Sequence, residues 1–243
     1  MTYCLAMKVD SGLVFASDTR TNAGVDYVTA YGKMHVFTPH ADRLFVVLSA
    51  GNLAITQEVV DTLRRDLEAN DAAHSLAHGR YLFEVAQYVG TLSVQVQQRH
   101  HEALAASGIN GEVTLILGGQ IRGSEPEIFL IYPQGNYIHA SRQTPYLQIG
   151  ENKYGKPMLD RMLRTSTPLA DAARLALVSL DATMRSNVTV GPPFDLAIYE
   201  RDRFALSHNE RIEVDSGFYE RFRAAWQHGM EAAFRQLPAF DWE

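Results

Sequence analysis

Cysteine and positive charge are both scarce in this sequence. Cys4 is the only cysteine among 243 residues, which excludes an intrachain disulfide. A chain of this length buries roughly three quarters of its unfolded surface, so it needs neither disulfides nor a structural metal for stability. Its 22 basic residues are outnumbered by 28 acidic ones, for a formal net charge of -6. This balance argues against a nucleic-acid partner, because proteins that bind nucleic acids present a basic face.

Long apolar runs are absent as well. The most apolar window, Leu44 to Ala50, has the length of a strand and falls far short of the roughly 18 residues of a membrane span. The segment from Met1 to Lys8 lacks the basic region and the apolar core of a secretory signal. We therefore expect no membrane association and a cytoplasmic location.

Strand blocks alternate with helices along the chain. The order is strands, two helices, strands, two helices, strands and a closing helix. Strands are expected at Tyr3 to Val9, Leu13 to Ser17, Arg43 to Ser49, Val113 to Leu117, Ile128 to Tyr132, Phe194 to Tyr199 and Phe204 to Leu206; helices are expected from Leu53, through Leu76 to Leu104, and at Tyr154 to Leu163, Leu169 to Met184 and Asp215 to Leu237. This order favours an α+β fold of two packed sheets covered by helices on their outer faces. Without a linker or repeat, one domain over residues 1–243 is expected.

Thr2 is the first residue whose side chain could take part in catalysis. It follows the initiator methionine, and its side chain is small enough for methionine aminopeptidase to remove Met1. The processed chain would then begin with a residue that carries both a nucleophilic hydroxyl and a titratable amine, the pairing that nucleophilic catalysis requires. Many proteins begin Met-Thr without catalytic use, so Thr2 alone leaves both interpretations open.

Further residues follow Thr2 in a recognisable order. Asp18 and Arg20 lie in Ser-Asp-Thr-Arg after the opening hairpin, Lys33 comes some fifteen residues later, and Ser-Ala-Gly ending at Gly51 precedes the first helix. With a Gly-Gly pair in mid-chain, this arrangement resembles the proteasome-type N-terminal-nucleophile hydrolases over the whole chain. Taken singly, Asp18 and Arg20 fit a turn-stabilising ion pair, and Lys33 fits a solvated surface charge.

The resemblance implies a four-layer αββα sandwich in which Thr2 attacks an amide carbonyl. It further implies that Lys33 and Asp18 tune the nucleophile, that Arg20 supports Asp18, and that the N–H of Gly51 stabilises the oxyanion. An α-amine has a pKa of about 7.7 to 8.0 against about 10.4 for lysine, so about a tenth of such amines are neutral at pH 7 but well under a thousandth of lysines. This difference favours the Thr2 amine as general base and Lys33 as a nearby cation.

Three supporting positions depart from the better-known proteasomal pattern. Glu151 stands where a Ser is usual, Ser186 stands in place of an Asp, and Thr189 in place of a second Ser. These positions normally hold the N-terminal amine and its proton-relay water. Glu151 either replaces the missing carboxylate by holding the amine or is an ordinary acid at a helix N-terminus, stabilised by the helix dipole.

The predicted function is a threonine peptidase that hydrolyses peptide or amide bonds through an acyl-enzyme on Thr2, with no cofactor and no metal. Two alternatives remain: a small-molecule amidase or acyl-transfer enzyme with the same nucleophile, and a noncatalytic self-assembling scaffold. The resemblance implies homo-oligomers, as rings or open spirals, and an ATPase partner by analogy only.

Two further motifs receive structural interpretations. The segment Gly118-Gly119-x-x-x-Gly123 has no helix after it, so it is predicted to be a hairpin loop and not a phosphate cradle. An apolar stripe at helical spacing in the closing helix is predicted to be core or a subunit contact and not a cofactor site. Its members are Tyr219, Phe222, Trp226 and Met230.

Overall fold

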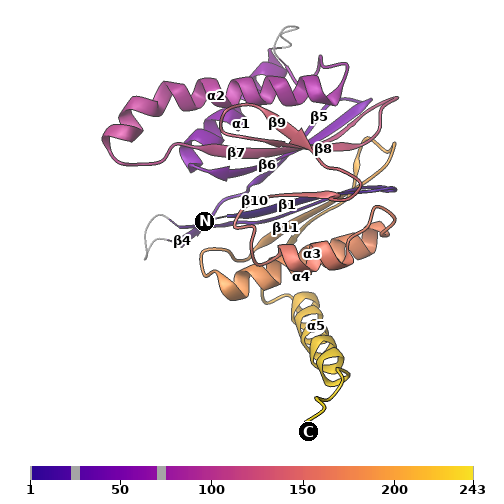
Figure 1. The fold of residues 1–243 in the computed structure, drawn as a ribbon. Coiled ribbons are helices and arrows are strands. Elements are labelled where there is room, and N and C mark those ends of the chain that lie inside the picture. Colours follow the sequence, from indigo (N-terminus) through magenta and orange to yellow (C-terminus); the bar gives the residue numbers. More distant parts are fainter. Residues whose placement is uncertain (1, 23–27, 70–74, 243) are drawn as a thin grey trace.

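The protein is a four-layer αββα sandwich (Figure 1). The computed structural model describes residues 2–22, 28–69 and 75–242. One sheet has the order β10-β1-β2-β11-β12, and its strands are β1 (Tyr3–Val9), β2 (Gly12–Asp18), β10 (Tyr146–Gly150), β11 (Phe194–Glu200) and β12 (Leu206–Ile212). The other has the order β5-β6-β7-β8-β9, with β5 (Met34–His40), β6 (Arg43–Gly51), β7 (Val113–Ile121), β8 (Glu127–Ile131) and β9 (Tyr137–His139).

Helices cover the outer face of each sheet. Helices α1 (Leu53–Glu68) and α2 (Leu82–Ala106) lie on the β5–β9 sheet, while α3 (Lys156–Met162) and α4 (Leu169–Ser186) lie on the sheet that contains β1 (Figure 1). Helix α5 (Gly217–Arg235) follows β12 and extends away from these layers. The expected α+β sandwich of two sheets with outer helices is therefore confirmed. No helix in the described ranges is long and apolar enough to cross a membrane.

Both faces of the first strand are buried, which places the chain start inside the core. Tyr3, Leu5 and Met7 pack toward the helices, whereas Cys4 and Ala6 belong to the cluster between the two sheets. Successive side chains of a strand point to opposite faces, so an uninterrupted apolar run is buried on both sides. Residue 2, immediately before this strand, is thereby held at one end of the two-sheet core.

The Gly-Gly pair corrects one prediction, because Gly118 and Gly119 lie inside β7 and not in a loop. A Cβ on Gly118 would lie 2.5 Å from the ring of Phe15, and one on Gly119 would lie 2.1 Å from the carbonyl oxygen of Leu44. Close packing around both positions explains the two glycines, although a Gly-Gly pair in the sequence predicts a turn.

The last hairpin was also placed too early. Phe204 lies outside any strand and has a positive φ of 52°, while β12 runs from Leu206 to Ile212. Most of β12 is polar and exposed at the sheet edge, so its sequence lacks the apolar alternation by which strands were identified. Two short strands, β3 (Arg20–Asn22) and β4 (Val28–Ala30), pair with each other beside the site described next.

Candidate functional site

Thr2 is fixed by its neighbours in the sheet. The N–H of Glu151 donates a hydrogen bond of 2.7 Å to the carbonyl oxygen of Thr2, and β1 pairs with β10 from Tyr3 opposite Gly150. A Cβ on Gly150 would lie only 1.9 Å from that same oxygen, so the backbones can approach this closely only at a glycine. The sheet therefore holds the Thr2 backbone from β10.

Asp18 and Lys33 form a buried ion pair. The Nζ of Lys33 lies 2.7 Å from Oδ1 of Asp18, and the two side chains are only 6% and 0% exposed. Such a pair requires additional hydrogen bonds to offset the loss of water around both charges. The N–H of Tyr3 donates to Oδ1 of Asp18 at 3.0 Å, and the N–H of Gly191 donates to Oδ2 at 3.3 Å. The carboxylate is thus held by the chain start, by a distant loop and by Lys33.

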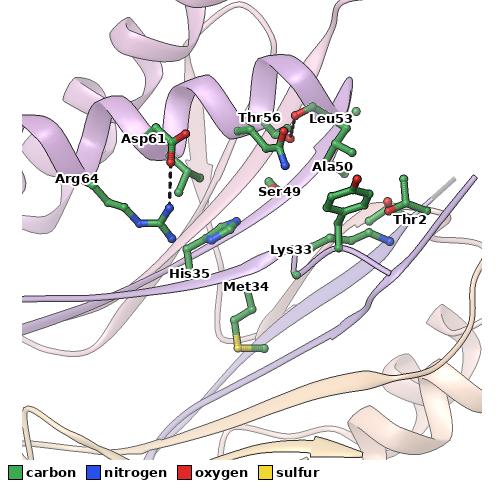
Figure 2. A pocket seen from close by; sticks show the side chains of 16 residues that line it. Thr2, Lys33, Met34, His35, Ser49, Ala50, Leu53, Thr56, Asp61 and Arg64 are labelled. Carbon is green, nitrogen blue, oxygen red and sulfur yellow. Dashed lines mark hydrogen bonds and ion pairs between the residues drawn. The ribbon is translucent and has the colours of Figure 1, made fainter. Parts of the chain in front are cut away.

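Lys33 has a second acceptor and points at the chain start. Its ammonium group donates to the carbonyl oxygen of Arg20 at 2.6 Å, and its own carbonyl oxygen accepts a 3.0 Å hydrogen bond from the N–H of Ser49 in β6. Figure 2 shows the Lys33 side chain extending toward Thr2. An ammonium group has three N–H donors. Two are accounted for by Asp18 and Arg20, which leaves one for a group near Thr2.

Opposing effects act on the Asp18 carboxyl. Burial raises the pKa of Asp18 above its ordinary value, while the charge of Lys33 and the hydrogen bonds from Tyr3 and Gly191 act to lower it. The charged form of Asp18 is therefore favoured only while Lys33 and the two N–H donors are present. Next to it, burial raises the pKa of the Cys4 thiol, which keeps this thiol protonated.

A cavity of about 430 Å³ opens beside Thr2 and lies against β5, β6 and α1 (Figure 2). Gly51 is exposed in its wall at the end of β6, with a positive φ of 120°. A Cβ there would lie 2.2 Å from the carbonyl oxygen of Glu112, so the backbone conformation and the close approach both require glycine. The cavity brings a hydroxyl, an ammonium group and a strand-end backbone together.

The end of the cavity away from Thr2 carries polar side chains. His35 lies beside Arg64, whose guanidinium donates a 3.0 Å hydrogen bond to Asp61 (Figure 2). Burial, together with the charge of Arg64, lowers the pKa of His35 to about 4. Its imidazole is therefore neutral at neutral pH.

The family resemblance implies that Arg20 supports Asp18, and among the described residues the Arg20 guanidinium group is directed at the loop that follows α4. The guanidinium donates to the carbonyl oxygen of Val188 at 2.7 Å and packs against Gly191, where a Cβ would lie 2.4 Å from its central carbon. Because the N–H of Gly191 donates to Asp18, Arg20 acts on this acid through the loop that follows α4. The carbonyl oxygen of Arg20 contributes separately, by accepting from Lys33.

Two of the three altered positions, Glu151 and Thr189, share Asn187 as a hydrogen-bond partner, whereas the third is exposed. Glu151 is buried, and its carboxylate accepts from the side-chain amide of Asn187 at 3.0 Å and from the N–H of Lys153 at 3.3 Å. The hydroxyl of Thr189 donates a 2.6 Å hydrogen bond to Oδ1 of the same Asn187 side chain. Ser186 is exposed at the last residue of α4.

Glu151 is not an acid in the first turn of a helix, because α3 begins only at Lys156. The alternative, that its carboxylate holds the amine of Thr2, stays a prediction. Met1, whose removal this role requires, lies outside the described residues.

Sequence reasoning missed three contributors to the site: the N–H groups of Tyr3 and Gly191, and the side chain of Asn187. Every residue except proline has a backbone N–H, so residue type could not identify the N–H groups of Tyr3 and Gly191 as donors. Asn187 stands between Ser186 and Thr189, but its residue type and position gave no signal of a role in the site. Among the residues described, no group of three or more metal-binding side chains forms a cation site.

Comparison with known proteins supports the family that the motifs indicate. The proteasome subunit family matches residues 2–199. Anbu (ancestral beta-subunit) from Yersinia bercovieri is 44% identical, with a TM-score of 0.91 over 98% of this chain and 99% of that one. Anbu from Hyphomicrobium sp. strain MC1 is 42% identical, with a TM-score of 0.87 over 98% of this chain and 99% of that one.

A further solved structure is described as a helical assembly of the Anbu complex from Pseudomonas aeruginosa. It is 40% identical, with a TM-score of 0.91 and coverage of 98% of both chains. No curated protein sequence matches. The family match and the near full-length similarity to three Anbu structures together assign the chain: it belongs to the proteasome subunit family and, within it, to the Anbu group.

Proposed function

We propose that this protein is an N-terminal threonine hydrolase that cleaves peptide bonds, with Thr2 as the nucleophile after removal of Met1. The observation that carries the proposal is the buried Lys33 ammonium group. It is oriented by Asp18 at 2.7 Å and by the carbonyl oxygen of Arg20 at 2.6 Å, and it extends toward Thr2. A solvated surface lysine would have neither the burial nor the two acceptors.

In this mechanism Lys33 is a cation and not the general base. An ammonium group that donates to Asp18 and to a carbonyl oxygen has no lone pair with which to accept a proton. Its positive charge instead stabilises the developing alkoxide of Thr2. The base is the α-amine of Thr2, since amines of this type are partly neutral near pH 7.

The reaction proceeds in two balanced halves. The Thr2 hydroxyl transfers its proton to the α-amine while Oγ bonds to the substrate carbonyl carbon, and the resulting oxyanion is stabilised by the N–H of Gly51. The C–N bond then breaks, and the α-ammonium returns the proton to the leaving amine. Water attacks the ester in the same way, releasing a carboxylic acid and regenerating the Thr2 hydroxyl.

Glu151 is proposed to hold the α-amine, with Asn187 orienting its carboxylate. The support is its burial and the hydrogen bond that its N–H donates to the Thr2 carbonyl oxygen. A carboxylate that holds an amine raises the pKa of that amine, so this arrangement would move the activity toward higher pH than an uncharged partner allows. Thr189 joins this network through Asn187, while the exposed Ser186 is given no role.

The test compares Thr2→Ala with Thr2→Ser, because both side chains permit removal of Met1 and only Ser keeps a hydroxyl. Fluorogenic peptides measure hydrolysis, and mass spectrometry measures Met1 removal and labelling of Thr2 by a threonine-directed electrophile. Thr2→Ala is expected to lose at least about 1000-fold in activity and all labelling, whereas Thr2→Ser retains both in part.

Hydrolysis by Thr2→Ala at the wild-type rate would refute the mechanism. A wild-type protein that keeps Met1 and takes no label would instead favour the noncatalytic scaffold. Turnover of small amides in place of peptides would favour the amidase alternative, which uses the same nucleophile.

A further inference from the structure

The cavity beside Thr2 extends well beyond the groups that the proposed reaction uses. One face of α1 forms a wall of it, with Leu53, Gln57, Val60, Asp61 and Arg64 at helical spacing. Arg64 lies about 16 Å further along the helix axis than Leu53. Figure 2 shows Thr2 at one end of the cavity and Arg64 at the other. A substrate side chain that starts at the reacting carbonyl group therefore has room to extend toward Arg64.

Apolar side chains form part of the wall along this route. Ala50 and Leu53 line the cavity at the Thr2 end, and Val60 lines it further along α1. Methylene groups of a long side chain pack well on such a surface, whereas a polar end group requires hydrogen-bond partners. The wall thus favours an unbranched side chain with a polar end, provided that the far end of the cavity supplies those partners.

Arg64 supplies hydrogen-bond donors at that far end. Its Nη1 donates a 3.0 Å hydrogen bond to Oδ1 of Asp61, and among the residues that the structure describes the guanidinium group has no other hydrogen-bond partner. A guanidinium group carries five N–H donors in a planar fork that can hold a carboxylate by two parallel hydrogen bonds. The Arg64 side chain is 54% exposed, so most of its donors are open to a ligand.

The imidazole of His35 lies next to the Arg64 guanidinium group (Figure 2). Burial, followed by the charge of Arg64, lowers the pKa of His35, and the opposing effect of Asp61 is smaller than that of Arg64. The Arg64–Asp61 pair therefore presents its positive member to the ring. A neutral imidazole adds one N–H donor of its own. This combination of a cation and a neutral donor suits an anionic end group.

Strand β3 contributes a buried hydroxyl to the same cavity. Oγ1 of Thr21 has no hydrogen-bond partner among the residues that the structure describes, although Thr21 lines the cavity. Buried polar atoms in native proteins are usually paired, and a ligand can supply the partner where the chain does not. The N–H and C=O groups of a peptide fit this requirement, which agrees with a peptide occupant.

We propose that the cavity selects peptides with glutamate as the residue that supplies the scissile carbonyl group, and that Arg64 and His35 bind the glutamate carboxylate. The inference rests on the proposed function, because it takes Thr2 as the attacking residue. An extended glutamate spans about 5 Å from its carbonyl carbon to its side-chain carboxyl carbon. His35 lies about 7 Å beyond Lys33 along the chain, so a carboxylate at that reach comes close to the ring. Arg64 approaches the same place from α1.

The first test measures hydrolysis of fluorogenic peptides that differ only in having Glu, Gln or Lys at this residue. Glu and Gln have the same length and differ in charge, so their ratio of kcat/KM isolates the carboxylate. We expect a ratio of at least about 10 in the wild type, which Arg64→Met lowers to below about 3. The matched control is Arg65→Met, because Arg65 is the exposed neighbour, bonds to Asp66 and does not line the cavity.

Arg64→Met is expected to fold normally, since the Arg64–Asp61 pair is exposed and such pairs contribute little to stability. A wild-type ratio near 1, or a high ratio that persists in Arg64→Met, would overturn the inference and leave the hydrolase proposal standing. A preference for Lys over Gln that Asp61→Asn removes would show that Asp61 reads the substrate, and would overturn it as well.

The second test separates binding from hydrolysis. Acetylated tripeptide amides that end in Glu or Gln are titrated by calorimetry into Thr2→Ala, which lacks the nucleophile. The Glu peptide is expected to bind at least about 10-fold more tightly, and the further substitution Arg64→Met removes this difference. Equal affinity of the two peptides for Thr2→Ala would contradict the inference. Tighter binding of the Glu peptide, in a protein whose wild type hydrolyses none of the peptides, would support the Arg64 subsite and count against the proposed function alone.

Discussion

Near Thr2 the chain pairs the buried charges of Asp18 and Lys33 by itself, whereas along α5 it leaves apolar groups exposed. Asp18, with no exposure, receives hydrogen bonds from Lys33, Tyr3 and Gly191, which come from three separate segments. In α5 only Tyr219 has comparable burial. The contrast separates a site that the chain assembles from its own distant segments from a terminal helix whose large apolar side chains are mostly exposed. The following predictions test each side of this contrast.

The largest stability effect is expected at the buried ion pair. Lys33→Met should lower the free energy of unfolding by about 3 to 5 kcal/mol at pH 8, because it leaves the Asp18 carboxylate buried without its cation. The loss should shrink as the pH falls, since burial raises the pKa of Asp18 and the neutral acid needs no partner. Urea unfolding at pH 8 and pH 5 measures both effects.

The control is the double variant Lys33→Met with Asp18→Asn, which removes both charges. It should recover most of the stability and none of the activity. Equal losses for Lys33→Met at the two pH values would mean that the destabilisation does not come from an unpaired charge.

A smaller, pH-dependent effect is expected at His35. Its pKa is about 4 in the folded protein against an ordinary 6.5, so the unfolded chain binds more protons between these values. The stability contributed by the neutral ring is complete above pH 6.5 and is lost as the pH falls toward 4. His35→Phe should therefore flatten the fall in unfolding free energy between pH 7 and pH 4 by up to about 3 kcal/mol.

Denaturant titrations across this range provide the measurement. His208→Gln, on the exposed part of β12, serves as the comparison and should follow the wild-type curve. A His35→Phe curve parallel to that of the wild type would show that this ring does not contribute to the acid sensitivity.

The smallest effect is expected where α5 joins the body. Tyr219→Phe removes one hydroxyl that donates to Asp181, and Arg185 continues to bond that carboxylate at 2.9 Å. The expected cost is about 1 kcal/mol, the usual net value of a hydrogen bond, measured by thermal unfolding. Gln227→Ala, at an exposed position of the same helix, should change stability by less than about 0.5 kcal/mol. A larger loss for Gln227→Ala would indicate that the exposed part of α5 is stabilised within one chain.

Much of the architecture could be predicted because the spacing of apolar residues in the sequence matches the residues that are buried in the strands and helices. The opening hairpin was predicted at Tyr3 to Val9 and Leu13 to Ser17, and the structure has strands at Tyr3–Val9 and Gly12–Asp18. The predictions were wrong where one residue type is compatible with two structures, as glycine is with a turn and with a closely packed strand. In the sequence Gly118 predicts a turn, but in the structure Phe15 occupies the space that a side chain at this position would need. The polar strand β12 had no apolar alternation to reveal it.

The candidate site also has a part that the sequence predicted and a part that it did not. The order Thr2, Asp18, Lys33 and Gly51 was predicted from motifs, and the structure places Thr2, Lys33 and Gly51 along one cavity with Asp18 bonded to Lys33. Their catalytic roles stay predictions until activity is measured. The indirect action of Arg20 through Gly191 was not predicted, because the loop begins far from Arg20 in the chain, with Val188 168 residues away, and a local pattern cannot pair the two.

Side-chain chemistry is local information, so residue order alone was sufficient to identify the nucleophile candidate, its acid and cation partners, and the family. Which groups surround them is non-local. The donation from the N–H of Gly191 to Asp18, the close approach of Gly150 to the Thr2 carbonyl and the exposure of Phe234 on a projecting helix all depend on how distant segments pack. Backbone donors and uncovered faces have no residue signature, and for that reason only the folded chain reveals them.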